Sequence, residues 1–128
     1  KGKLFDVMKK TFLYSFYRAL GGIAYTFRYE RNFRIHVFFA IVVLCFAFIF
    51  RVSSFERIIL LILVSFVWAL ELVNTAVEIL LDVTKPRLSE QAKRIKDCMA
   101  AAVLAASLGA ALSGVILFYP YLIEWLNK

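Results

Sequence analysis

Three long apolar runs constrain the fold of this chain more than any other feature of its sequence. They cover residues 33–50, 58–81 and 98–126, and each reaches, with its flanks, the roughly 20 residues that an α-helix needs to cross a bilayer. The chain has 128 residues and 62% of them are hydrophobic, which is more apolar side chain than a soluble domain of this size can bury. We therefore predict an all-α membrane protein, a single membrane domain over residues 1–128 with three transmembrane helices.

The segment before the first run has a different pattern. In residues 4–28, aromatic and aliphatic residues recur at helical spacing with Lys and Arg among them, which is typical of a helix that lies in the membrane interface. Gly21 and Gly22 predict a break or kink within this segment. We therefore expect an N-terminal amphipathic surface helix that is interrupted near its middle.

The basic residues lie at the ends of the apolar runs. The net charge is +7, but the Lys and Arg side chains form no stripe along a soluble face, so we expect no nucleic-acid partner. The segment through Arg34 holds eight of them and the 82–97 loop holds five, whereas residues 51–57 hold two. Because cytoplasmic loops carry the excess of Lys and Arg, this distribution predicts a cytoplasmic N-terminus and a cytoplasmic 82–97 loop.

The third run is rich in small residues at four-residue spacing. The two rows are Ala101, Ala105, Gly109 and Ser113, and Ala102, Ala106, Ala110 and Gly114. Small side chains let helix backbones approach closely in lipid. The pattern therefore predicts that the 98–126 helix is central to a helix bundle.

The second run carries two carboxylates and an amide. Glu71, Asn74 and Glu78 are three and four residues apart, so they share one face of a helix. A charged residue costs roughly 2.5–3.5 kcal/mol at the centre of a transmembrane helix on insertion scales, and this face needs a polar partner, a cation or water. Three interpretations stay open: a structural polar network between helices, a proton or ion pathway, and a metal-dependent active site. Because the carboxylates gather in the cytoplasmic half of the run, we favour the active site.

Three further charged residues could contribute to such a site. Glu30 lies just before the first run, where it could pair with a neighbouring arginine or, together with Glu78, offer the oxygen ligands that Mg²⁺ prefers. Lys96 and Asp97 lie at the start of the third run. Lys96 could neutralise phosphate charge, and Asp97 could bind a ligand hydroxyl or amine or cap the helix.

Three segments of the sequence belong together as a motif set: ERNFRIH (30–36), ELVNTAVE (71–78) and AKRIKDCMAAAV (92–103). They resemble the bacterial diacylglycerol kinase family, which includes the undecaprenol kinases, and the resemblance covers nearly the whole chain. It implies three transmembrane helices and an amphipathic surface helix, assembled as a homotrimer in the bacterial cytoplasmic (inner) membrane. It also implies active sites at the cytoplasmic membrane surface, with residues shared between subunits.

The resemblance further implies a reaction and a role for each candidate residue. The γ-phosphate of Mg-ATP would pass to a lipid hydroxyl, of undecaprenol or of diacylglycerol, and the ERNFRIH form is closer to the undecaprenol kinases. By match of motif, Glu71 is the general base, and Glu30 and Glu78 bind Mg²⁺. The positions on the nucleotide side are Glu30, Asn74, Lys96 and Asp97.

One departure from the family lies in the loop before the third run. Many members carry a Tyr-His pair there, with the histidine against the nucleotide base, whereas this chain has Leu88 and Ser89. Base recognition is therefore expected to differ. The alternatives to a lipid kinase are a non-enzymatic membrane assembly subunit and a small ion or proton pathway, and an activity that depends on Glu71 would argue against the assembly subunit.

Overall fold

The protein is built from four α-helices. The computed structural model describes residues 2–84 and 89–127, and side chains for 11–84 and 89–127. The helices are α1 (Gly2–Tyr29), α2 (Arg31–Ile49), α3 (Ser54–Thr84) and α4 (Glu90–Leu126). The three later helices are long and apolar enough to cross a membrane, and the described residues contain no strand. The predicted all-α membrane fold is confirmed.

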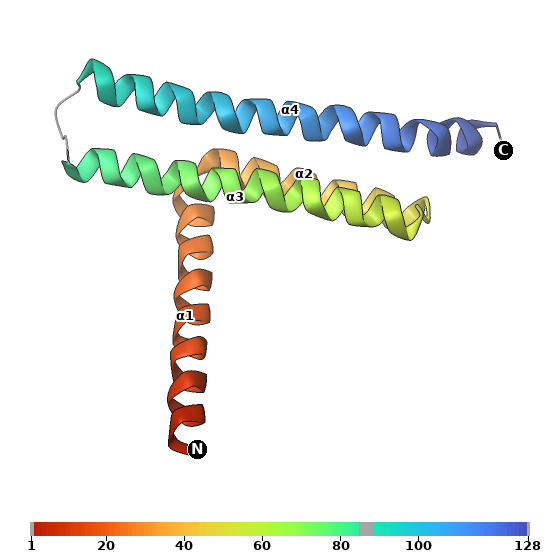
Figure 1. The fold of residues 1–128 in the computed structure, drawn as a ribbon. Helices are drawn as coiled ribbons and strands as arrows, with labels where there is room; N and C mark the ends of the chain where they lie inside the picture. Colours follow the sequence, from red (N-terminus) through yellow and green to blue (C-terminus); the bar gives the residue numbers. More distant parts are fainter. Residues whose placement is uncertain (1, 85–88, 128) are drawn as a thin grey trace.

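The helices form a bundle with one crosswise arm. In Figure 1, α2, α3 and α4 run alongside one another, and α1 projects crosswise from them. α3 packs against α4 and α2, while α1 touches α2 and α3 near the start of α2. If the three parallel helices span the bilayer, α1 lies along its surface. The structure therefore agrees with a surface helix attached to three spans.

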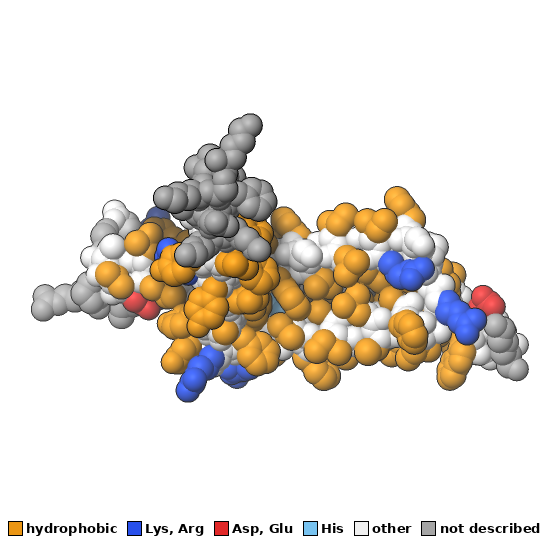
Figure 2. Space-filling view, turned by 90° about the horizontal axis from the view of Figure 1, so that it is seen from below, with side chains coloured by type: hydrophobic (Ala, Val, Ile, Leu, Met, Phe, Trp, Pro, Cys, Tyr) orange, Lys and Arg blue, Asp and Glu red, His pale blue; other side chains and the backbone are white. Residues whose placement is uncertain are grey.

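The exposed side chains of the protomer match a lipid environment. Hydrophobic side chains cover the middle of the bundle in Figure 2, and most of the charged side chains visible on this face lie toward its ends and on α1. On α1, aromatic side chains are exposed together with arginines, and the Arg18 guanidinium lies over the Tyr14 ring at 5.8 Å from its centroid. Such cation–π pairs suit an interfacial helix, because the cation stays near water while the ring enters the headgroup layer.

The expected interruption of α1 was wrong. The helix runs without a break through Gly21 and Gly22, and a Cβ added at either position would meet nothing within 4 Å. A glycine in a helix interior costs only about 1 kcal/mol relative to alanine, so long helical flanks on both sides can carry the pair.

The helices on either side of the 82–97 loop are longer than their apolar runs. Residues 82–84 continue α3, and residues 90–97 open α4, so these positions are helical rather than part of the expected loop. Ser89 is the N-cap of α4, and its hydroxyl oxygen accepts a hydrogen bond of 3.1 Å from the Ala92 amide. Hydropathy marks only the part of a helix that suits lipid, whereas capping decides where the backbone turns.

The prediction that the third span is central was also wrong within one protomer. α3 contacts the other three helices, whereas α4 packs mainly on α3. Of the two small-residue rows, Ala101, Ala105 and Gly109 are exposed, while Ala106, Ala110 and Gly114 are partly covered. Ser113, the last residue of the first row, is partly covered, and Ala102, the first of the second row, is exposed. The Ala101, Ala105 and Gly109 stretch of α4 therefore faces away from the bundle.

The end of the bundle farthest from α1 is closed by aromatic packing and one hydrogen bond. Ala47, Val52 and Leu60 are buried there, and Phe118 packs against this group from α4. The Tyr121 hydroxyl donates a hydrogen bond of 2.7 Å to the Glu56 carboxylate. The α2–α3 turn is thus tied to the C-terminal part of α4.

The Ser89 cap gives a first testable prediction. Ser89→Ala should destabilise the protein by about 1 kcal/mol, because the orphan amide at the start of α4 loses its acceptor. Ser89→Asp keeps an acceptor in the same place and serves as the matched control. Thermal unfolding in detergent should show a lower melting temperature for the alanine variant only, and equal losses in both variants would contradict the cap.

Candidate active site

The centre of the candidate site is a buried carboxylate on α3. Glu71 has 2% of its surface exposed and Thr75, one turn later, has 3%. The Thr75 hydroxyl donates to the Glu71 backbone oxygen at 3.0 Å, so it does not neutralise the carboxylate. Ionisable residues at such positions in membrane helices are expensive and mark functional sites.

The nearest polar group to this carboxylate comes from α2. His36 Nε2 lies 3.0 Å from Glu71 Oε1, although the contact lacks the alignment of a hydrogen bond, and Glu71 Oε1 has no hydrogen-bond partner among the described residues. The sequence analysis did not single out His36. Its signal was that it is the chain's one histidine, placed at the charged end of an otherwise uncharged span.

Two further carboxylates lie close to Glu71. Glu30 is the N-cap residue of α2, between α1 and α2, and its side chain makes no capping hydrogen bond. The charges of Glu30 and Glu78 both act on Glu71. Glu30 and Glu78 therefore lie within electrostatic range of Glu71, near the place where α1, α2 and α3 meet.

Arg34 does not serve as the partner of Glu30. Its Nη1 atom donates to the backbone oxygens of Phe27 and Arg28, at 3.3 Å and 2.9 Å. This arginine therefore caps the C-terminus of α1, where unpaired carbonyl groups favour a cation. The cap holds α1 against α2 at the place where Glu30 lies.

The α3 face that carries Glu71 also holds unsatisfied polar atoms. Asn74 Nδ2 donates to Glu78 Oε1 at 3.1 Å, which orients one oxygen of Glu78. Within the described part of the chain, buried Trp68 Nε1 and Asn74 Oδ1 have no hydrogen-bond partner, and neither does Glu71 Oε1. Buried polar groups nearly always find partners, so this face is built to meet a ligand or another chain.

Lys96 lies farther out, between α3 and α4. Its Nζ atom contacts Asp82 Oδ1 at 2.7 Å, and the charge of Glu78 also acts on it. Lys96 is therefore linked to the outer end of the carboxylate cluster.

The structure does not bring Asp97 into this cluster. Asp97 is exposed on α4. It does not cap the helix, because α4 begins a full seven residues earlier, at Glu90, and Ser89 is its cap. Leu88, the other half of the departure from the family pattern, lies outside the described residues.

The donor set is compatible with Mg²⁺ held together with phosphate. No group of three or more His, Cys, Asp or Glu residues is placed to hold a metal by itself in the part of the chain that the structure describes. Mg²⁺ commonly takes only one or two carboxylates and completes its shell with phosphate and water. Glu30 and Glu78 offer such oxygens beside a buried Glu71, so the residues present fit a metal that arrives with a nucleotide.

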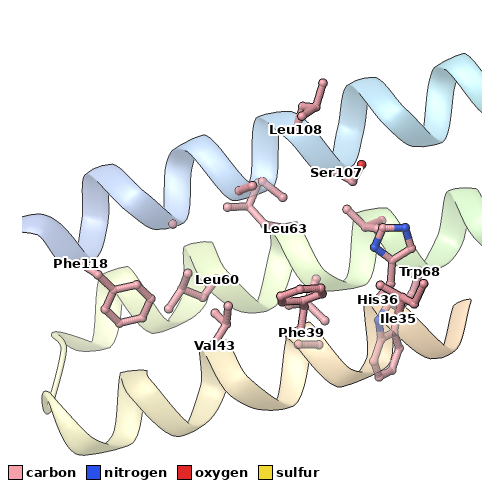
Figure 3. Close-up of a pocket in the computed structure, with 16 residues that line it drawn as sticks. Ile35, His36, Phe39, Val43, Leu60, Leu63, Trp68, Ser107, Leu108 and Phe118 are labelled. Atoms are coloured by element: carbon pink, nitrogen blue, oxygen red, sulfur yellow. The ribbon is translucent and has the colours of Figure 1, made fainter. Parts of the chain in front are cut away.

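An apolar hollow is lined at one end by His36, the residue that contacts Glu71. It lies between α2, α3 and α4 and has a volume of about 420 Å³. Figure 3 shows His36 and Trp68 at one end of it, and Leu60 and Phe118 toward the other. Because the lining is almost entirely apolar, the hollow suits hydrocarbon, and it ends beside the imidazole that touches Glu71.

Fold and site together define a small membrane protein with a carboxylate cluster where a surface helix meets two spans. Residues 17–118 match the family model described as prokaryotic diacylglycerol kinase, and the chain belongs to that family. The resemblance predicted from the three motifs is confirmed.

Two relatives show how the chain compares with named members. It is 38% identical over 113 residues to a diacylglycerol kinase of Synechocystis sp. (strain ATCC 27184 / PCC 6803 / Kazusa), covering 88% of this chain and 65% of that protein. It is 36% identical over 111 residues to an undecaprenol kinase of Bacillus subtilis (strain 168), covering 87% of this chain and 90% of that protein. The chain thus spans less than two thirds of the first relative and most of the second.

Proposed function

We propose that this protein transfers the γ-phosphate of ATP, bound with Mg²⁺, to the hydroxyl group of a membrane lipid. One observation carries the proposal: the buried Glu71 lies with Glu30 and Glu78 at the junction of α1, α2 and α3, in a chain that belongs to the prokaryotic diacylglycerol kinase family. A carboxylate cluster at this depth matches the needs of phosphate transfer to an interfacial alcohol.

Each residue of the cluster has a chemical task in this reaction. Glu71 accepts the proton that the lipid hydroxyl loses as its oxygen attacks phosphorus. Glu30 and Glu78 would hold Mg²⁺, which would offset charge on the transferring phosphoryl group. Asn74 fixes the orientation of Glu78 through its 3.1 Å hydrogen bond. Lys96 leaves Asp82 to contact nucleotide phosphate, and Asp97 contacts the nucleotide from the exposed side of α4.

The placement of the helices supports access from two sides. In Figure 1, the C-terminal end of α3 and the N-terminal end of α4 extend beyond the level of α1. Asp82 belongs to the last turn of α3 and contacts Lys96 near the start of α4, so this pair would face the aqueous side of the surface helix. ATP would arrive there, and the lipid would reach Glu71 from the bilayer. With the basic N-terminal segment and the 82–97 region inside, this side is the cytoplasm of a bacterium and the membrane is its cytoplasmic membrane.

The two relatives are named for different lipid alcohols. One relative is named for diacylglycerol and the other for undecaprenol. We favour undecaprenol, because the ERNFRIH segment (30–36) resembles that branch of the family.

A direct assay tests the proposed function. Purified protein in detergent, supplied with Mg²⁺ and γ-labelled ATP, should transfer label to undecaprenol faster than to diacylglycerol when the two are compared side by side. The control is the same mixture with EDTA, which should abolish transfer. Transfer to neither alcohol would overturn the kinase proposal, and faster transfer to diacylglycerol would correct only the acceptor.

The role of Glu71 can be separated from that of a metal ligand or a structural residue. Glu71→Gln keeps size and most hydrogen bonding but cannot accept the alcohol proton. Turnover should fall about 10²–10⁴-fold, while the KM for ATP should change little, because the lost interaction belongs to the transition state. Near-normal turnover of Glu71→Gln would show that Glu71 is not the general base. A large drop in its melting temperature would instead indicate a structural role.

The metal role of Glu30 and Glu78 has its own readout. Glu30→Gln and Glu78→Gln should each raise the Mg²⁺ concentration needed for half-maximal rate, because each removes one charged oxygen ligand. Glu56→Gln, at the far end of the bundle, is the matched control and should leave the titration unchanged. Identical Mg²⁺ titrations for the wild type and the three variants would refute the assignment of Glu30 and Glu78 as metal ligands.

A homotrimer is expected from the unsatisfied α3 face. Trp68 Nε1 and Asn74 Oδ1 are buried without partners among the described residues, and the exposed Ala101, Ala105 and Gly109 of α4 offer close packing to another helix. Neighbouring subunits can supply hydrogen-bond partners for the polar face of α3 and a helix that packs on the small residues of α4. Native mass spectrometry should therefore give a trimer, and a monodisperse, active monomer would contradict it.

A further inference from the structure

We infer that His36 is a positioning residue for Glu71: its imidazole holds one carboxylate oxygen and leaves the other free for the lipid hydroxyl. The inference rests on the proposed lipid kinase function and adds a residue to it. Its starting point is the contact between two spans, in which His36 Nε2 on α2 lies 3.0 Å from Glu71 Oε1 on α3.

Among the described residues, the other polar neighbours of Glu71 are directed elsewhere. The Thr75 hydroxyl donates to the Glu71 backbone oxygen, and the Asn74 amide donates to Glu78. Glu71 Oε1 has no hydrogen bond in the described part of the chain, and the Glu71 side chain is only 3% exposed. The imidazole is thus the polar group that the structure places in contact with this carboxylate, at 3.0 Å.

The charges around the pair make such a donor necessary. Glu30, between α1 and α2, and Glu78, on α3, both place negative charge near Glu71. Two cations that could offset this negative charge make other contacts: Arg34 caps α1, and Lys96 contacts Asp82. From α4, the polar side chain that lines the same hollow is Ser107. Without the imidazole, none of these groups would donate a hydrogen bond to the Glu71 carboxylate.

The position of His36 also explains how the alcohol could approach. The imidazole lines the apolar hollow between α2, α3 and α4 (Figure 3), and its Nε2 atom also lies 3.0 Å from Glu71 Oε1. A lipid whose chain occupies the hollow would bring its hydroxyl beside the carboxylate. Apo structures often show catalytic contacts that are poorly aligned and tighten when substrate binds, and a small rotation of the imidazole would direct its N–H at Oε1.

The proton inventory of the step is simple. The lipid hydroxyl oxygen forms a bond to the γ-phosphorus, and the bond from that phosphorus to the ADP oxygen breaks. The hydroxyl proton passes to Glu71 Oε2. His36 keeps its Nε2 proton throughout and continues to hold Oε1, and Glu71 returns its proton to water after the lipid phosphate has left.

A spectroscopic test does not depend on activity. The chain has one histidine, so ¹⁵N-histidine labelling of protein purified through a tag without histidine gives a single imidazole spectrum. The wild type should show a proton fixed on Nε2, and Glu71→Leu should release it to the mixture of tautomers found in free imidazole. Ser107→Ala, which alters another group lining the hollow, should leave the spectrum unchanged. The same imidazole spectrum in the wild type and in Glu71→Leu would overturn the inference.

A kinetic test separates positioning from simple packing. His36→Leu should lower kcat about 10- to 100-fold with little change in the KM for ATP, because a misplaced base costs rate more than binding. His36→Gln places an amide N–H near the position of Nε2 and should recover most of the rate. If His36→Leu turns over within twofold of the wild type, or if Leu and Gln variants lose rate equally, the inference fails.

Different results would refute the lipid kinase function and the positioning role of His36. A wild-type protein that phosphorylates no lipid alcohol refutes the proposed function, whatever the imidazole spectrum shows. An active wild type whose rate is unaffected by His36→Leu refutes the positioning role alone. Thermal unfolding of each variant confirms that a lost rate does not come from a lost fold.

Discussion

Backbone hydrogen bonding in lipid is the constraint on which the rest of this structure depends. Inside a bilayer no water is present to satisfy an amide or a carbonyl group, so a spanning segment must be a continuous helix. α2, α3 and α4 meet this condition over their apolar lengths. The chain can change direction only near the two membrane surfaces, and the α1–α2 junction with Glu30 is one of these places. The candidate site therefore lies beside a backbone junction and near polar helix ends.

Glu71 shows how a costly polar group is accommodated within such a frame. A charged side chain near the centre of a membrane helix costs several kcal/mol of free energy. In this structure, the Glu71 carboxylate contacts the His36 imidazole of a neighbouring span. Its place toward the α1 end of α3 also keeps it near Glu78 and the more exposed Asp82. Polarity thus increases along one face of α3 from the hollow to the water. In the proposed reaction, a lipid hydroxyl and a nucleotide phosphate would meet along that gradient without either leaving its own solvent.

Some parts of this structure could be read from the sequence, and the physical reasons for success and failure differ. The spans are readable because hydropathy follows solvent, and the stripe from Glu71 to Glu78 is readable because helical geometry is regular. The extension of α4 back to Glu90 depends on the Ser89 cap, which an apolar run does not reveal. The Gly21–Gly22 pair was misleading because the penalty of two glycines is small against a long helix. The His36–Glu71 contact depends on the register between α2 and α3, which one sequence by itself does not reveal.

The same distinction explains why the predicted central position of α4 does not hold in one protomer. Small residues indicate that a helix can pack closely, but they do not indicate against which neighbour. In the structure some of them are partly covered and others, including Ala105 and Gly109, are exposed, while α3 keeps buried polar atoms without partners among the described residues. Close packing and polar satisfaction are the two main sources of helix association in lipid, where the hydrophobic effect between helices is absent. On this protomer the exposed small residues of α4 pack against no other helix, and buried polar atoms of α3 lack hydrogen-bond partners among the described residues. An assembly of identical chains could cover the first and provide partners for the second. Under the proposed function, the polar face of α3 that carries the reaction would also favour the assembly of identical chains into an oligomer.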